Sequence, residues 1–157
     1  MVQTLGVKSK MESVEFERPG TVEEAVNLLQ STTGNAKILA GGTDLLVQLR
    51  AHMVEPDVII DIKDIEETRT LTKNSDGSYT IGAAVAGAEA GDRDDVTKDW
   101  PGVVEGWELI GSTQIQGRAS LGGNLCNASP AGDSVPAMVA AGTVSYTHLT
   151  LPTNREV

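Results

Sequence analysis

The sequence predicts an α/β fold, and three observations support this prediction. Short apolar runs at residues 37–40 and 58–62 are typical of buried strands. Amphipathic segments at residues 22–31 and 43–52 are typical of helices and alternate with those runs. The glycine pair Gly41 and Gly42 stands where a strand gives way to a helix. This alternation predicts a small α/β unit over residues 13–62 whose parallel strands end near the glycine pair.

The elements of this unit follow in order along the chain. Residues 1–12 show no periodicity and are expected to form a disordered extension, and residues 13–19 are a strand-like run, SVEFERP. Thr21 and Glu24 have the T-x-x-E spacing of a capping box, which predicts the start of the helix at 22–31. Thr43 is expected to cap the next helix, TDLLVQLRAH.

The second half of the chain predicts a hairpin followed by short helices. The runs at 68–73 and 78–83 flank NSDGS, whose Asp-Gly pair is typical of a hairpin turn. A short helix and an exposed loop at 89–95 are expected next, and Trp100 and Pro101 open a further helix. Residues 112–133 are rich in Gly, Ser and Asn, which favours a long loop kept for ligand binding. The last helix is expected over 134–141, with Pro136 in its first turn.

Composition excludes several classes of function. The 22 acidic and 12 basic residues give a net charge of -10, which disfavours nucleic acid and anionic membranes as partners. Cys126 is the single cysteine, so this chain cannot supply a disulfide or the four thiolates of an iron–sulfur cluster. His52 and His148 have no partner at metal-ligand spacing, and no apolar run approaches the ~20 residues of a membrane span. We therefore expect a cytoplasmic protein without a metal site in this chain.

The first motif with chemical meaning is AGGTDL at residues 40–45. Paired glycines allow a sharp turn in which successive backbone NH groups face one point, an arrangement that binds phosphate. The same dipeptide before a helix is also common turn chemistry, so this motif alone leaves both interpretations open.

The second motif is ASLGGNLCNASPAGD at residues 119–133. It predicts a second Gly-Gly turn between Ser120 and Asn124, both of which can hydrogen-bond a polar ligand. Asp133 could accept hydrogen bonds from sugar hydroxyls, or it could cap the helix at 134–141, and the two roles are compatible.

The two motifs together resemble a known family, although neither is a Rossmann G-x-G-x-x-G or a P-loop. AGGTDLL, followed far downstream by GSTQIQGRASLGGNLCNASPAGDSVPA, is similar to the FAD-binding (medium) subunit of molybdenum hydroxylases of the xanthine dehydrogenase and carbon monoxide dehydrogenase type. The resemblance covers about residues 13–143.

The resemblance implies a p-cresol methylhydroxylase-type FAD-binding fold with two subdomains. The first would span about residues 13–62. Residues 68–143 would form the start of the second, which would be incomplete because the family continues beyond this chain. The resemblance places the FAD pyrophosphate on a first loop and closes the site with a second loop and an acidic residue. These cofactor-binding positions are Leu39, Ala40, Gly41, Gly42, Thr43, Asp44 and Leu45, then Ser120, Leu121, Gly122, Gly123 and Asn124, and finally Asp133.

The implied function is that of a flavin-dependent oxidoreductase subunit. FAD would receive electrons from a separate iron–sulfur small subunit, which takes them from a molybdenum-cofactor large subunit, and would pass them to an acceptor such as NAD. The implied role assigns no catalytic side chain to this chain. A stand-alone FAD-dependent oxidoreductase of the same fold and a non-functional truncated fragment are the alternatives, the latter because residues 144–157 have the character of a non-native tail.

Overall fold

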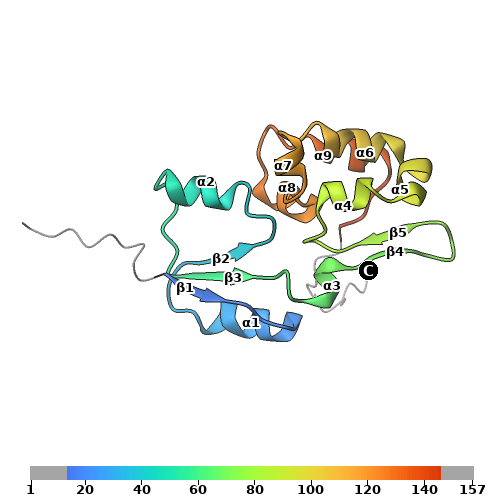
Figure 1. Ribbon diagram of the computed structural model, residues 1–157. Helices are drawn as coiled ribbons and strands as arrows, with labels where there is room; N and C mark the ends of the chain where they lie inside the picture. Colours follow the sequence, from blue (N-terminus) through green and yellow to red (C-terminus); the bar gives the residue numbers. More distant parts are fainter. Residues whose placement is uncertain (1–13, 146–157) are drawn as a thin grey trace, which may run out of the picture.

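Figure 1 shows a computed structural model of the protein, in which residues 14–145 are described. The N-terminal part is a three-stranded parallel sheet of β1 (Glu15–Glu17), β2 (Ala36–Leu39) and β3 (Val58–Asp61) in the order β1-β3-β2. Helices α1 (Val22–Ser31) and α2 (Leu45–Arg50) connect the strands and lie on opposite faces of the sheet (Figure 1). The predicted alternation of parallel strands and helices is confirmed.

Helix α1 begins where the capping pattern predicts. The Thr21 hydroxyl accepts a hydrogen bond from the Glu24 NH at 3.1 Å, and the Glu24 carboxylate accepts one from the Gly20 NH at 2.8 Å. These bonds satisfy donors at the helix start. Ala25 then packs with Val58 and Ile60 in a small core between α1 and the sheet.

The rest of the described chain consists of the antiparallel hairpin of β4 (Leu71–Lys73) and β5 (Tyr79–Ile81) and of a set of helices. The helices that follow the first unit are short, and they are α3 (Glu66–Arg69), α4 (Gly87–Gly91), α5 (Asp94–Asp99), α6 (Pro101–Glu108), α7 (Thr113–Gln116), α8 (Leu121–Asn127) and α9 (Ser134–Ala140). Trp107 is 2% exposed in their common core, which confirms its packing role. Trp100 precedes Pro101 at the start of α6, as predicted.

Two expected elements are wrong in detail. Thr68 and Arg69, expected to begin the strand-like run at 68–73, belong to helix α3 instead, and the Thr68 hydroxyl donates to the carbonyls of Ile62 and Ile65. The expected short helix is present as α4, but the expected exposed loop at 89–95 is shorter than predicted, because residues 89–91 end α4 and residues 94–95 begin α5, whose Val96 is buried. Here the apolar side chain that enters the core outweighs a locally charged sequence, since tertiary burial overrides weak local preference.

The expected disordered extension at 1–12 lies outside the described residues, as does nearly all of the expected tail at 144–157.

Candidate functional site

The first glycine segment forms a turn at the carboxyl end of β2. Gly42 has φ +81°, a conformation that favours glycine, and its carbonyl accepts a hydrogen bond from the Leu46 NH at 3.0 Å. Thr43 therefore lies within the turn, and α2 begins at Leu45, one residue later than a cap at Thr43 implies. Asp44 occupies the cap position but its side chain makes no cap hydrogen bond.

The backbone NH groups of residues 41–45 form a run of five donors, none of which donates a hydrogen bond to any group within residues 14–145. Four of the five residues are half-buried and Asp44 is exposed. Partly buried donors without partners are unfavourable unless water or a ligand pairs with them, so this turn is suited to an oxygen-rich anion.

The second glycine segment is not a turn, and that prediction is wrong. Gly122 and Gly123 lie in the first turn of α8, which Ser120 caps by accepting a hydrogen bond from the Gly123 NH at 3.1 Å. Leu121 is buried in the core and draws this segment into the fold. A Cβ on Gly122 would lie 2.7 Å from three atoms of Ala83, so the absence of a side chain is needed there for close packing.

The structure brings the two glycine segments together. A Cβ on Gly41 would overlap the carbonyl oxygen of Arg118, so the turn and the chain leading into α8 are in direct contact. The Gln48 amide of α2 also donates to the Asn127 side chain of α8 at 3.2 Å. Buried Ser120 is thereby placed two residues from the peptide that touches Gly41.

Two further predicted residues lie beside α8 and α9. The Asn124 side-chain oxygen accepts a hydrogen bond from the buried Ser134 hydroxyl at 2.6 Å, which leaves its NH₂ group as a donor. Asp133 occupies the N-cap position of α9, as expected, but its exposed side chain makes no cap hydrogen bond. Its carboxylate remains available to solvent.

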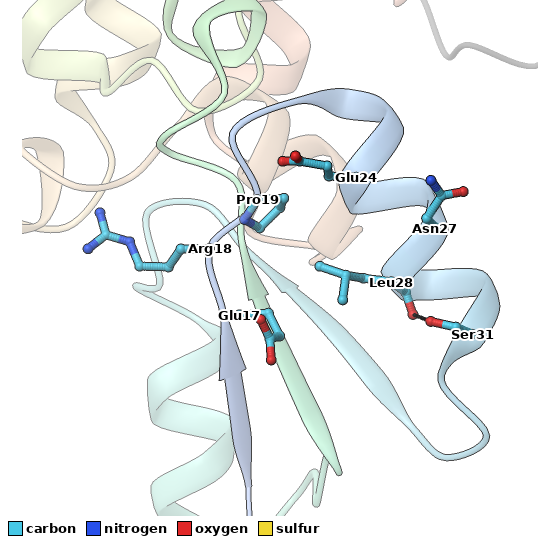
Figure 2. Close-up of a pocket in the computed structure, with 7 residues that line it drawn as sticks. All are labelled: Glu17, Arg18, Pro19, Glu24, Asn27, Leu28 and Ser31. Atoms are coloured by element: carbon cyan, nitrogen blue, oxygen red, sulfur yellow. Dashed lines mark hydrogen bonds between the residues drawn. The ribbon is translucent and has the colours of Figure 1, made fainter.

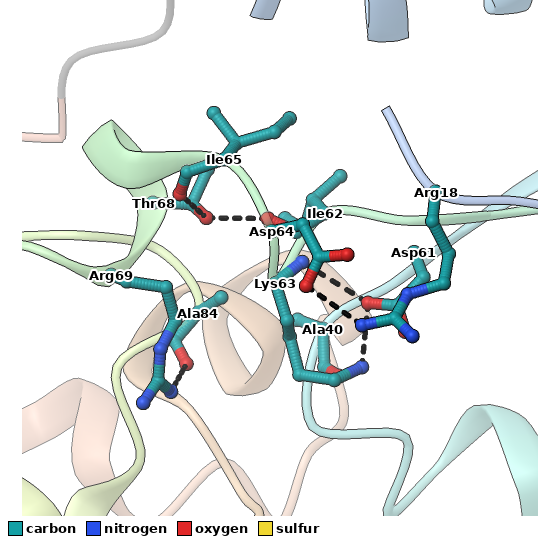
Figure 3. Close-up of polar contacts among 10 residues, drawn as sticks. All are labelled: Arg18, Ala40, Asp61, Ile62, Lys63, Asp64, Ile65, Thr68, Arg69 and Ala84. Carbon is teal, nitrogen blue, oxygen red and sulfur yellow. Dashed lines mark hydrogen bonds and ion pairs between the residues drawn. The ribbon is translucent and has the colours of Figure 1, made fainter. Parts of the chain in front are cut away.

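The sequence did not predict a charged pair, Lys63 and Asp61, that lies beside Ala40 at the start of the first glycine segment (Figure 3). The Lys63 ammonium donates to the Ala40 carbonyl at 2.9 Å and to the Asp61 carboxylate at 2.7 Å. Asp61 is 5% exposed and also accepts from the Lys63 NH at 3.0 Å. The available signal was a charged D-x-K at the carboxyl end of a buried parallel strand, the edge where ligands bind in open α/β sheets.

The side chains with displaced pKa values lie away from this site. A hydrogen bond from Arg93 lowers the pKa of Asp95 to about 2, and one from Lys73 lowers the pKa of Asp99. The Lys73–Asp99 pair joins β4 to α5, whereas the Arg93–Asp95 pair lies at the start of α5, where Arg93 also donates to the Leu71 carbonyl of β4. They are structural ion pairs outside the two glycine segments.

A separate hollow of about 450 Å³ lies between β1 and α1 (Figure 2). Its lining residues are Glu17, Arg18, Pro19, Glu24, Asn27, Leu28 and Ser31, none of which belongs to either glycine segment. Across residues 14–145 there is no group of three or more acidic, His or Cys side chains suited to a metal ion. No helix in that range is long and apolar enough to span a membrane.

Comparison with known proteins shows the family to which the chain belongs. Residues 10–150 match the family described as the FAD binding domain in molybdopterin dehydrogenase. The chain belongs to this family. It is 35% identical over 119 residues to the xanthine dehydrogenase FAD-binding subunit of Escherichia coli O157:H7, which covers 76% of this chain and 40% of that protein. It is 34% identical over 129 residues to the nicotinate dehydrogenase FAD-subunit of Eubacterium barkeri, covering 82% of this chain and 43% of the relative.

Solved structures of the same family share the fold. Carbon monoxide dehydrogenase from Hydrogenophaga pseudoflava superposes with a TM-score of 0.70 at 31% identity, over 74% of this chain and 40% of that one. The enzyme from Oligotropha carboxidovorans gives a TM-score of 0.72 at 28% identity, over 78% and 42%. The α/β FAD-binding fold implied by the motifs is thus confirmed. The chain spans about two fifths of the length of these relatives.

The residues of this FAD-family domain fit the group that gives the family its name. FAD carries a pyrophosphate, and the turn at residues 41–45 offers backbone donors that have no acceptor within residues 14–145. The missing side chains of Gly41 and Gly42 let this turn pack against Arg118 and Leu39. The NH₂ group of Asn124 and the carboxylate of Asp133 add one donor and one acceptor for the polar parts of a nucleotide.

Proposed function

We propose that this chain holds FAD at the junction of its two glycine segments. The observation that carries the proposal is the direct contact between the turn at Gly41 and the peptide of Arg118, because it unites both motifs of the family in one place. The site would comprise Leu39, Ala40, Gly41, Gly42, Thr43, Asp44 and Leu45 from the turn, Ser120, Leu121, Gly122, Gly123 and Asn124 from α8, and Asp133.

These residues have different tasks in the proposed site. The NH groups of residues 41–45 bind the pyrophosphate, which lets a chain of net charge -10 bind an anion without a cluster of cationic side chains. Gly122 brings α8 close to Ala83 and so fixes where Ser120 and Asn124 stand. Asn124 is oriented by Ser134, and its NH₂ group donates to the ligand. Asp133 accepts from a hydroxyl of the ligand.

The proposed role of the chain is that of an electron-relay subunit. When bound, FAD supplies two-electron chemistry between the iron–sulfur clusters of a small subunit and an acceptor such as NAD. A large subunit with the molybdenum cofactor would oxidise the substrate. Two of the relatives are FAD subunits of xanthine dehydrogenase and of nicotinate dehydrogenase, which supports this class of complex. The protein contributes position and backbone donors, and no side chain here needs to transfer a proton.

Titration of FAD tests the proposal. FAD fluorescence and isothermal calorimetry are measured on this chain and on the same chain extended to the length of its relatives. We expect saturable binding with one FAD per chain and competition by ADP, which shares the pyrophosphate. Absence of FAD binding by both proteins would contradict the proposal. FAD binding that ADP does not compete with would also contradict it, because the site would then not recognise the pyrophosphate.

A further inference from the structure

The peptide between Ala40 and Gly41 begins the anion-binding turn, and Gly41 alone does not fix its orientation. The Ala40 carbonyl and the Gly41 NH belong to one planar trans peptide, so they point in opposite directions. Gly41 lacks a Cβ and tolerates rotation of this peptide more readily than other residues do. If the peptide turned over, the carbonyl would take the place of the NH and would repel an anion.

Lys63 fixes the orientation of that peptide. Its ammonium donates to the Ala40 carbonyl at 2.9 Å, and Figure 3 shows the side chain lying between that oxygen and Asp61. The Asp61 carboxylate receives both the ammonium and the NH of Lys63, at 2.7 Å and 3.0 Å. Because Asp61 follows Ile60 on β3 and pairs in register with Leu39 of β2, the anchor belongs to the rigid sheet.

We infer that Lys63 is a positioning residue of the anion-binding turn, anchored by the buried Asp61. It holds the Ala40 carbonyl back so that the Gly41 NH faces outward with the other four free NH groups. The nearby Asp61 charge compensates that of Lys63, so the effect on a bound anion acts through the peptide and not through long-range attraction. This inference rests on the proposed function, since it names what prepares the turn for the FAD pyrophosphate.

The test compares Lys63→Met, Lys63→Arg and a charge-matched control, Lys37→Met. Lys37 lies on β2, which leads into the same turn, and makes no ion pair or side-chain hydrogen bond within residues 14–145. We expect Lys63→Met to weaken FAD binding on the order of tenfold, the effect of losing a hydrogen bond to a charged group. Lys63→Arg, which keeps a donor for both oxygens, should restore most of the affinity, and Lys37→Met should bind within about threefold of the parent.

Salt dependence separates positioning from direct contact with phosphate. A positioning role predicts the same slope of log Kd against log salt for the parent and Lys63→Met. A shallower slope in the variant would mean that Lys63 pairs with the phosphate, and the inference would be overturned. Equal affinity of Lys63→Met and parent would also overturn it, as would failure of Lys63→Arg to rescue when it folds with the parental melting temperature.

A readout without FAD keeps this inference distinct from the proposed function. Nuclear magnetic resonance of the ¹⁵N-labelled chain reports the order of the NH groups at residues 41–45. We expect lower heteronuclear NOE values and a large shift of the Gly41 NH in Lys63→Met but not in Lys37→Met. If the parent does not bind FAD, the proposed function fails while this measurement still decides the inference. Unchanged Gly41 signals in Lys63→Met would overturn it.

Discussion

The two Gly-Gly pairs of this chain have the same sequence but meet different physical needs. At residues 41 and 42 the chain turns, Gly42 adopts φ +81°, and the NH groups of residues 41–45 have no acceptor in the described part of the chain. At residues 122 and 123 the chain is helical, and Gly122 serves to let α8 approach Ala83. The first pair therefore supplies donors and conformational freedom, and at Gly41 also room for the Arg118 carbonyl, whereas Gly122 supplies room alone. Substitutions at matched positions separate these two uses of glycine.

The largest effect is expected at Gly41, where both uses meet. Gly41→Ala places a Cβ onto the Arg118 carbonyl oxygen, and backbone on both sides prevents easy relief. Separation of the turn from α8 should cost roughly 3 kcal/mol or more of unfolding free energy, above the usual cost of overpacking. Chemical denaturation measures this, and FAD titration should show loss of binding. A variant with parental stability would mean that the two segments do not touch.

The second prediction contrasts the neighbours Gly122 and Gly123. Gly122→Ala meets Ala83 at 2.7 Å and should lose about 1–3 kcal/mol. Gly123→Ala meets only the Ser120 hydroxyl at 2.9 Å, so the loss of a cap, about 1 kcal/mol, is offset by a similar gain in helix propensity. Denaturation should therefore separate the two variants clearly. Equal losses would indicate that α8 is not packed as described.

The origin of this contrast explains how far sequence alone could go. The turn after β2 was predictable because an apolar run, two glycines and a helical period follow one another directly. The segment 112–133 was expected to be a loop because Gly, Ser and Asn have weak helix propensity. It forms α7 and α8 because Leu121 enters the core and Ser120 caps the helix start. That burial depends on Ala83 and Ala86, which lie more than thirty residues away in sequence.

The charged support of the turn was harder to foresee. Lys63 and Asp61 belong to a different strand from Ala40, and their meeting depends on the order β1-β3-β2, which places β3 beside β2. Local sequence predicts the strands but does not state which strand is central. In contrast, the family motifs placed both glycine segments together, and the structure brings them into contact, although the second has the wrong local structure in the prediction. That the two segments form one FAD site stays a prediction.

The third prediction isolates conformational freedom by comparing Gly42 with Gly77. Both have positive φ, +81° and +87°, so alanine at either position should cost about 1–2 kcal/mol. Gly77 lies in the open hairpin turn, where a Cβ meets nothing within 4 Å. Only Gly42→Ala should also weaken FAD binding, by at least about tenfold, because the turn must change its angles. Parallel melting and FAD titration check this, and equal FAD affinity in both variants would refute the assignment of the turn.

A fourth prediction concerns the ion pair of Arg93 and Asp95 at the start of α5. Because Arg93 lowers the pKa of Asp95 to about 2, the pair stabilises the folded state above the unfolded pKa near 4. That stabilisation is lost as pH falls from about 4 through about 2. Melting temperature should thus fall less steeply over this window in Asp95→Asn than in the parent. Identical pH profiles would show that the pair does not persist in solution.

The smallest effect is expected at Asp133, at the edge of the proposed site. Its side chain is exposed and makes no cap hydrogen bond, so Asp133→Ala should change the unfolding free energy by less than about 0.5 kcal/mol. In the proposed site it contributes one hydrogen bond to a hydroxyl of the ligand, so FAD affinity should fall by less than about tenfold. Titration of the variant with FAD measures this loss of affinity, and titration with pyrophosphate alone is the control. Pyrophosphate lacks hydroxyls on a sugar, so its affinity should be unchanged by Asp133→Ala but reduced by Gly42→Ala. A loss of pyrophosphate affinity in Asp133→Ala would mean that this carboxylate acts on the turn and not on the sugar.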